Sequence, residues 1–69
     1  MNWRLSLYGG FNLSGNFRDI IEYIKDLDYK DNMEIFIYEN NDLKYYINNK
    51  EDLNGFYNKF GIRYSTTAY

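Results

Sequence analysis

The stretch MEIFIYENNDLKYYIN, residues 33–48, holds two strand-like runs separated by a turn, and it decides how the chain can fold. Both MEIFIYE and LKYYIN are rich in β-branched and aromatic residues, which is typical of strands. Between them, ENND supplies residues that tolerate the unusual backbone angles of tight turns. The stretch therefore predicts a β-hairpin.

Two neighbouring tyrosines in the second run set its orientation. Successive side chains of a strand point to opposite faces of the sheet, so Tyr45 and Tyr46 cannot both enter the core. The register that places Leu43 and Ile47 toward the core also places Tyr45 there. We therefore predict that Tyr45 is a core residue and that Tyr46 lies on the surface.

The rest of the chain adds alternating elements on both sides of the hairpin. NWRLSLY, residues 2–8, alternates like a half-buried strand, and GGFNLSGN, residues 9–16, is predicted to be a loop. Apolar residues recur at helical spacing over 16–27, where Asn16 and Asp19 resemble a capping box. A second helix is predicted over 49–60, with Gly61 as its C-cap, and a fourth strand at IRYS, residues 62–65.

This order, β-α-β-β-α-β, predicts an α+β fold of the ferredoxin-like type in a single domain, residues 1–69. Both helices should cover one face of a four-stranded antiparallel sheet, with the first and third predicted strands in its centre. The residues expected to face the helices are Leu5, Leu7, Met33, Ile35, Ile37, Leu43, Tyr45, Ile47, Ile62 and Tyr64. Those expected on the open face are Arg4, Ser6, Tyr8, Glu34, Phe36, Tyr38, Lys44, Tyr46, Asn48 and Arg63.

The predicted open face carries several aromatic rings with an arginine among them. This is the composition of protein-binding hot spots, although cross-strand pairing alone could also explain the rings. The candidate partner-binding residues on this face are Arg4, Tyr8, Phe36, Tyr38, Lys44, Tyr46 and Arg63. In topology and in its central aromatics the chain resembles an RNA-recognition module, which implies binding of single-stranded RNA or DNA. LKYYIN stands, however, where that module's third-strand signature of lysine or arginine, glycine and phenylalanine is expected.

The composition argues against catalysis and against metal or cofactor binding. The chain has 69 residues with no cysteine and no histidine, so disulfides and the usual zinc ligands are absent, and the spacing proposes no nucleophile–base pair. Ten acidic and eight basic residues give a net charge of −2, which disfavours a surface built for nucleic acid. The N-terminus shows no signal sequence and no apolar run is long enough to span a membrane, so we expect a cytoplasmic protein.

Acidic residues form a stripe along the first predicted helix and the turn after it. The stripe comprises Asp19, Glu22, Asp26, Asp28 and Asp31. A solvated helix face, with Arg18 and Glu22 as an i,i+4 pair, is one interpretation. The alternative is phosphate mimicry, in which the carboxylates occupy a basic groove built for nucleic acid.

Clustered acids, small size and missing catalytic groups resemble the small phage-borne inhibitors of bacterial defence, anti-CRISPR proteins among them. The resemblance implies a stoichiometric inhibitor of a larger, nucleic-acid-handling bacterial protein, acting as a monomer or homodimer in the host cytoplasm. Immunity and antitoxin proteins that block a basic nuclease look similar. The sequence thus predicts a non-enzymatic protein-binding function without a membrane or a direct nucleic-acid partner, and a single-stranded nucleic-acid binder as the alternative.

Overall fold

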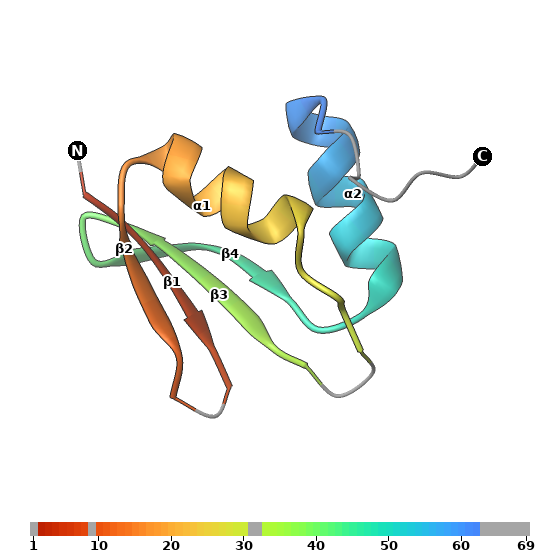
Figure 1. Cartoon of the computed structure of the whole chain (residues 1–69), viewed down its shortest axis with the longest axis horizontal. Coiled ribbons are helices and arrows are strands. Elements are labelled where there is room, and N and C mark those ends of the chain that lie inside the picture. The colour runs from red at the N-terminus through yellow and green to blue at the C-terminus, as the bar shows by residue number, and fades with distance from the viewer. Residues whose placement is uncertain (1, 9, 31–32, 63–69) are drawn as a thin grey trace.

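Two helices cover one face of a four-stranded antiparallel sheet (Figure 1). The computed structural model describes residues 2–8, 10–30 and 33–62. In chain order the elements are β1 (Trp3–Leu7), β2 (Asn12–Gly15), α1 (Phe17–Lys25), β3 (Ile35–Glu39), β4 (Asp42–Ile47) and α2 (Lys50–Phe60). This arrangement confirms the predicted α+β class, the four-stranded antiparallel sheet and the two helices.

The order of the strands differs from the predicted order. The sheet runs β2-β1-β3-β4, so the first and second predicted strands are central, and the third, now β4, lies at an edge. The fourth strand is β2, which comes from the glycine-rich stretch that was predicted to be a loop. Ile62 is not in a strand, and residues 63–65 of the predicted last strand lie outside the described residues. The ferredoxin-like order is therefore not confirmed.

The β3–β4 hairpin closes through Asn40 and Asn41, which both have positive φ angles, of 50° and 72°. Two-residue hairpin loops favour this left-handed backbone, and asparagine adopts it more readily than most residues. Further along, Tyr38 pairs with Leu43 while Ile37 pairs with Tyr45, so Lys44 is an extra residue in β4. This bulge turns Leu43 away from the core, and the prediction that Leu43 faces the helices is wrong.

Side-chain caps fix where both helices begin. The Asn16 side chain accepts a hydrogen bond from the Asp19 amide at 2.9 Å, and the Asp19 carboxylate accepts one from the Asn16 amide at 3.1 Å. This is the predicted capping box. Asn49 caps α2 in the same way through the Asp52 amide at 2.7 Å, and Gly61 ends the helix in the left-handed conformation with φ 64°. Local sequence therefore determines both helices.

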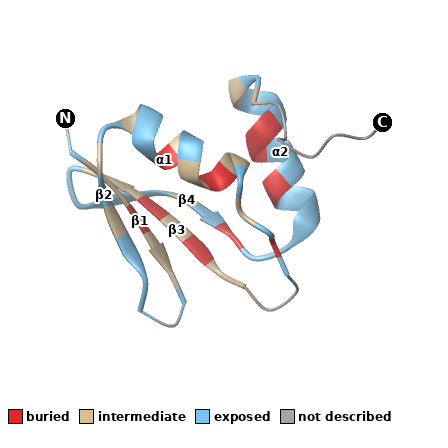
Figure 2. Cartoon of the chain, viewed as in Figure 1, coloured by how far each residue is buried: buried red, intermediate tan, exposed pale blue. Residues whose placement is uncertain are grey.

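The core lies between the sheet and the helices (Figure 2). Five of its side chains, Leu5, Ile20, Ile24, Ile35 and Ile37, are fully buried. The others in the buried cluster are Tyr29, Ile47, Leu53, Phe56 and Tyr57. Leu7, Met33 and Tyr45 pack at its border, as predicted. Ile62 packs there too, although not from a strand, and Tyr64 lies outside the described residues. Alternation in β1 and β3 thus fills a single core on one side of the sheet only.

The two adjacent tyrosines lie on opposite sides of β4, as predicted. The Tyr45 ring is half-buried and meets Phe56 and Phe60 edge-on, with centroids 5.3 and 5.6 Å away. Tyr46 is 42% exposed and tilts against Phe36 on the other face.

We expect Tyr45→Ala to lower the free energy of unfolding by about 3 kcal/mol, because it opens a cavity beside α2. Tyr46→Ala should cost about 1 kcal/mol. Urea denaturation of both variants measures the difference, and equal losses would contradict the register.

A buried hydroxyl joins the two helices. Tyr57 of α2 donates a hydrogen bond to the Ile24 carbonyl of α1 at 2.9 Å, and the same carbonyl accepts a hydrogen bond from the Leu27 amide at 3.1 Å. Tyr57→Phe should cost about 1 kcal/mol of unfolding free energy, because the variant loses one buried hydrogen bond while the Leu27 amide still pairs with that carbonyl. Tyr23→Phe, at a half-buried ring, is the matched control and should change stability little. Similar losses in the two variants would contradict the role of the buried hydroxyl.

Candidate partner-binding surface

The face of the sheet that points away from the helices carries most of the predicted binding residues. Strand register aligns Ser14, Arg4, Tyr38 and Leu43 in one row across the sheet. The next row contains Asn12, Ser6, Phe36 and Tyr46. Tyr8 follows β1 directly, and its amide donates to the Glu34 carbonyl at 3.1 Å. We call this surface, formed by the two rows with Tyr8 and Glu34, the open face.

Contacts among the side chains of the open face hold several of them in place. The Arg4 guanidinium lies 4.0 Å from the centroid of the Tyr38 ring, a cation–π contact. Phe36 and Tyr46 pack with centroids 5.0 Å apart. The Tyr46 hydroxyl also donates a hydrogen bond to the Glu34 carboxylate. Such contacts reduce the conformational entropy that these side chains would lose on binding a partner.

Three large side chains of the open face are exposed to solvent: Tyr8 at 76%, Leu43 at 52% and Tyr46 at 42%. Sequence reasoning assigned Tyr8 and Tyr46 to this face but missed Leu43. Simple alternation cannot place Leu43, because the bulge at Lys44 reverses the register within β4. The open face is therefore more apolar than the sequence predicts.

Of the two other basic residues predicted for the open face, Lys44 lies elsewhere and Arg63 is outside the described residues. Lys44 occupies the bulge at the edge of the sheet, where its ammonium group lies 3.8 Å from the Glu39 carboxylate. Residues 63–69 lie outside the described residues, and Arg63 is one of them. Arg4 is thus the one cation that the described residues place among the rings.

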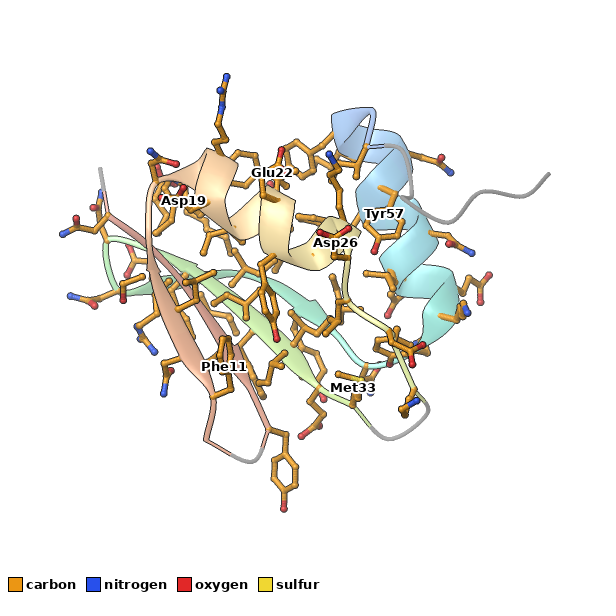
Figure 3. All side chains as sticks on the ribbon, viewed as in Figure 1. Phe11, Asp19, Glu22, Asp26, Met33 and Tyr57 are labelled. Carbon is orange, nitrogen blue, oxygen red and sulfur yellow. The ribbon has the colours of Figure 1, made fainter. Side chains whose placement is uncertain are left out.

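The acidic stripe lies along α1 and the segment after it, where Figure 3 labels Asp19, Glu22 and Asp26. Local partners already engage most of its carboxylates. Asp19 belongs to the capping box, and Glu22 pairs with Lys25 at 3.5 Å. Lys30 donates to Asp28 at 2.9 Å, and this hydrogen bond and the lysine's charge lower the pKa of Asp28. Asp31 lies outside the described residues. The stripe therefore presents less unpaired charge than its sequence suggests.

The two apolar residues of the glycine-rich stretch, Leu13 and Phe11, both contact other elements of the fold. Leu13 pairs with Leu5 within the sheet and packs at the border of the core. Phe11 stacks on Tyr23 of α1, with the rings 15° from parallel and their centroids 5.0 Å apart. Leu13 therefore serves the core, whereas Phe11 packs on α1 and is still 43% exposed.

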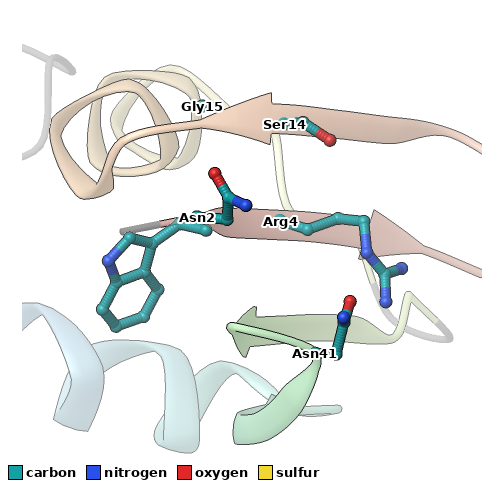
Figure 4. Close-up of a pocket in the computed structure, with 6 residues that line it drawn as sticks. Asn2, Arg4, Ser14, Gly15 and Asn41 are labelled. Carbon is teal, nitrogen blue, oxygen red and sulfur yellow. The ribbon is translucent and has the colours of Figure 1, made fainter.

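A shallow polar pocket of about 280 Å³ lies where β1, β2 and the β3–β4 turn meet (Figure 4). Asn2, Arg4, Ser14, Gly15 and Asn41 line it together with Trp3. Arg4 is the one titratable side chain among them, and its guanidinium stays protonated, so the pocket offers no general acid–base pair.

Among the described residues, no group of three acidic side chains could hold a metal ion. No described helix has the length and apolar character needed to cross a membrane.

Comparison with known proteins gives no further assignment. The chain matches no family model, no curated protein and no solved structure.

The pKa of the Tyr46 hydroxyl reports on the contacts of the open face. The hydrogen bond to the Glu34 carboxylate, then desolvation and that carboxylate's charge, raise the pKa of Tyr46 above its ordinary value of 10.0. Because the folded pKa is the higher one, the contribution of this bond to stability is complete below pH 10 and is lost as pH rises through the folded pKa. Glu34→Gln should lower the pKa of Tyr46, as followed by NMR of its labelled ring. An unchanged pKa would contradict the bond.

Proposed function

We propose that this protein is a non-catalytic inhibitor that binds a larger bacterial protein through its open face. The observation that carries the proposal is a continuous surface of rings, Leu43 and Arg4 that no other element of the described chain covers. Contiguous apolar patches of this kind mark interaction sites more often than isolated surface rings do. Tyrosine and arginine are also the residues that dominate binding energy at interfaces.

Charge on the open face favours a protein partner over a nucleic acid. Single-stranded nucleic acid needs a positively charged groove beside its stacking rings. The described open face offers Arg4 alone, and the Glu34 carboxylate beside Tyr46 would repel a phosphate. A nucleic-acid-binding module is therefore the weaker of the two candidates.

The class of partner follows from the charge of the whole chain and from the resemblance to anti-CRISPR and immunity proteins. A net charge of −2 favours association with a basic protein surface, such as one that handles nucleic acid. Glu22, Asp26 and Asp28 on the helix side would contribute by long-range steering rather than by direct contact. Blocking such a surface stoichiometrically requires no catalytic group, which agrees with a chain that has neither histidine nor cysteine.

Two double variants separate the open face from the acidic stripe. Tyr8→Ser with Leu43→Ser removes exposed apolar groups from the open face, whereas Glu22→Gln with Asp26→Asn neutralises the stripe and leaves the Asp19 capping box intact. We expect affinity for the partner isolated from a bacterial lysate to fall at least tenfold in the first pair and less than threefold in the second, by about 1.4 kcal/mol per factor of ten. The reverse order would assign binding to the stripe.

Titration with mixed-sequence single-stranded RNA and DNA tests the competing function. Fluorescence anisotropy at moderate salt should detect no binding in the micromolar range, because the described open face lacks a phosphate-binding groove. Tight binding that weakens steeply with added salt, and that Tyr46→Ala reduces, would instead establish a single-stranded nucleic-acid binder.

A further inference from the structure

The outer edge of β4 is a second surface that could bind a partner. Among the described strands β4 pairs with β3 alone, so its other edge leaves backbone amide and carbonyl groups without a strand partner. A groove of about 400 Å³ runs beside it, between residues 44–47 of β4 and one side of α2. Asp52, Gly55, Phe56 and Lys59 form the helical wall. Figure 1 shows α2 close to the C-terminal end of β4.

Gly55 is the unusual residue in this groove. Glycine in a helix interior is less stable than alanine, and Gly55 lies in the middle of α2. A Cβ atom built there would meet no atom of the chain within 4 Å. By contrast, a Cβ at Gly15 would collide with the Asp19 carboxylate, and Gly61 has a positive φ. Packing within the chain thus explains Gly15 and the left-handed backbone explains Gly61, but neither explains Gly55. Close approach of another backbone would explain it.

The walls of the groove define the chemistry of a ligand. Tyr45 and Phe56 offer ring surface for an apolar side chain. Two lysines flank it: the Lys59 ammonium group lies 5.2 Å from the Tyr45 ring centroid, and Lys44 lies on the strand with its ammonium group 3.8 Å from the Glu39 carboxylate. The Asp52 carboxylate already accepts a hydrogen bond from the Asn49 side chain at 3.0 Å. The groove therefore favours a ligand with apolar and acidic side chains.

We propose that an extended peptide segment of a partner protein adds to β4 as a fifth strand and lies in this groove. Its backbone would hydrogen-bond to the edge of β4, one apolar side chain would pack against the outer side of Tyr45 and Phe56, and acidic side chains would face Lys44 and Lys59. A second copy of the chain fits less well. Joining two β4 edges would bring the lysines of both copies together, and lysine on an edge strand opposes such pairing.

The probe is a synthetic peptide of alternating valine and threonine with a glutamate at each end, added to isotope-labelled protein and followed by NMR. We expect saturable shifts in the amides of β4 and around Gly55, and little change in β2.

Gly55→Ala should raise the melting temperature by a few degrees, because alanine is the better helix former. The same variant should weaken peptide binding about tenfold. Asn58→Ala, on α2 outside the groove, should raise the melting temperature while leaving peptide affinity unchanged.

A charge swap gives a readout that does not depend on Gly55. Lys59→Glu should weaken binding of the glutamate-flanked peptide and strengthen binding of an otherwise identical lysine-flanked peptide. The proposal is overturned if the wild-type protein shows no saturable binding, or if Gly55→Ala binds as well as wild type or loses stability. Shifts that map to β2, or that appear with rising protein concentration without peptide, would overturn it as well. The last result would assign the edge to a second copy of the chain.

Discussion

Burial of one face of the sheet by two short helices is the constraint on which the rest of the structure depends. Leu5, Ile35 and Ile37 are fully buried against Ile20 and Ile24, and the residues between them along each strand must then point the other way. A chain of 69 residues has length for one such core, with both described helices on the same side. The open face follows from this geometry, and so do the rings that the sequence places on it.

Local signals made the helices, the hairpin and the core face predictable from the sequence. The capping residues Asn16 and Asn49, the paired asparagines of the turn and the alternation of β1 and β3 each act over a few residues. Strand β2 gives no such signal, because Asn12, Ser14 and Gly15 are poor strand formers and pairing with β1 determines its conformation. The order of the strands likewise depends on contacts between distant segments.

The candidate site was predictable in its composition but not in its details. Alternation assigned Arg4, Phe36, Tyr38 and Tyr46 to one face, and the register places all four there. The bulge moved Leu43 to the open face and left Lys44 at the edge of the sheet, and no residue type in β4 predicts the bulge. The charges of the acidic stripe could be counted in the sequence, whereas the lysine partners of Glu22 and Asp28 required the folded chain.

We propose that the open face, rather than the helix side, meets the partner. Hydroxyl-radical footprinting of the free protein and of its complex tests this most directly, because it reports solvent access at individual side chains. Partner binding should protect Tyr8, Leu43 and Tyr46, while Phe11 and Tyr23 on the helix side react as in the free protein. Protection of Phe11 and Tyr23 with full reactivity at Tyr8 and Leu43 would contradict it.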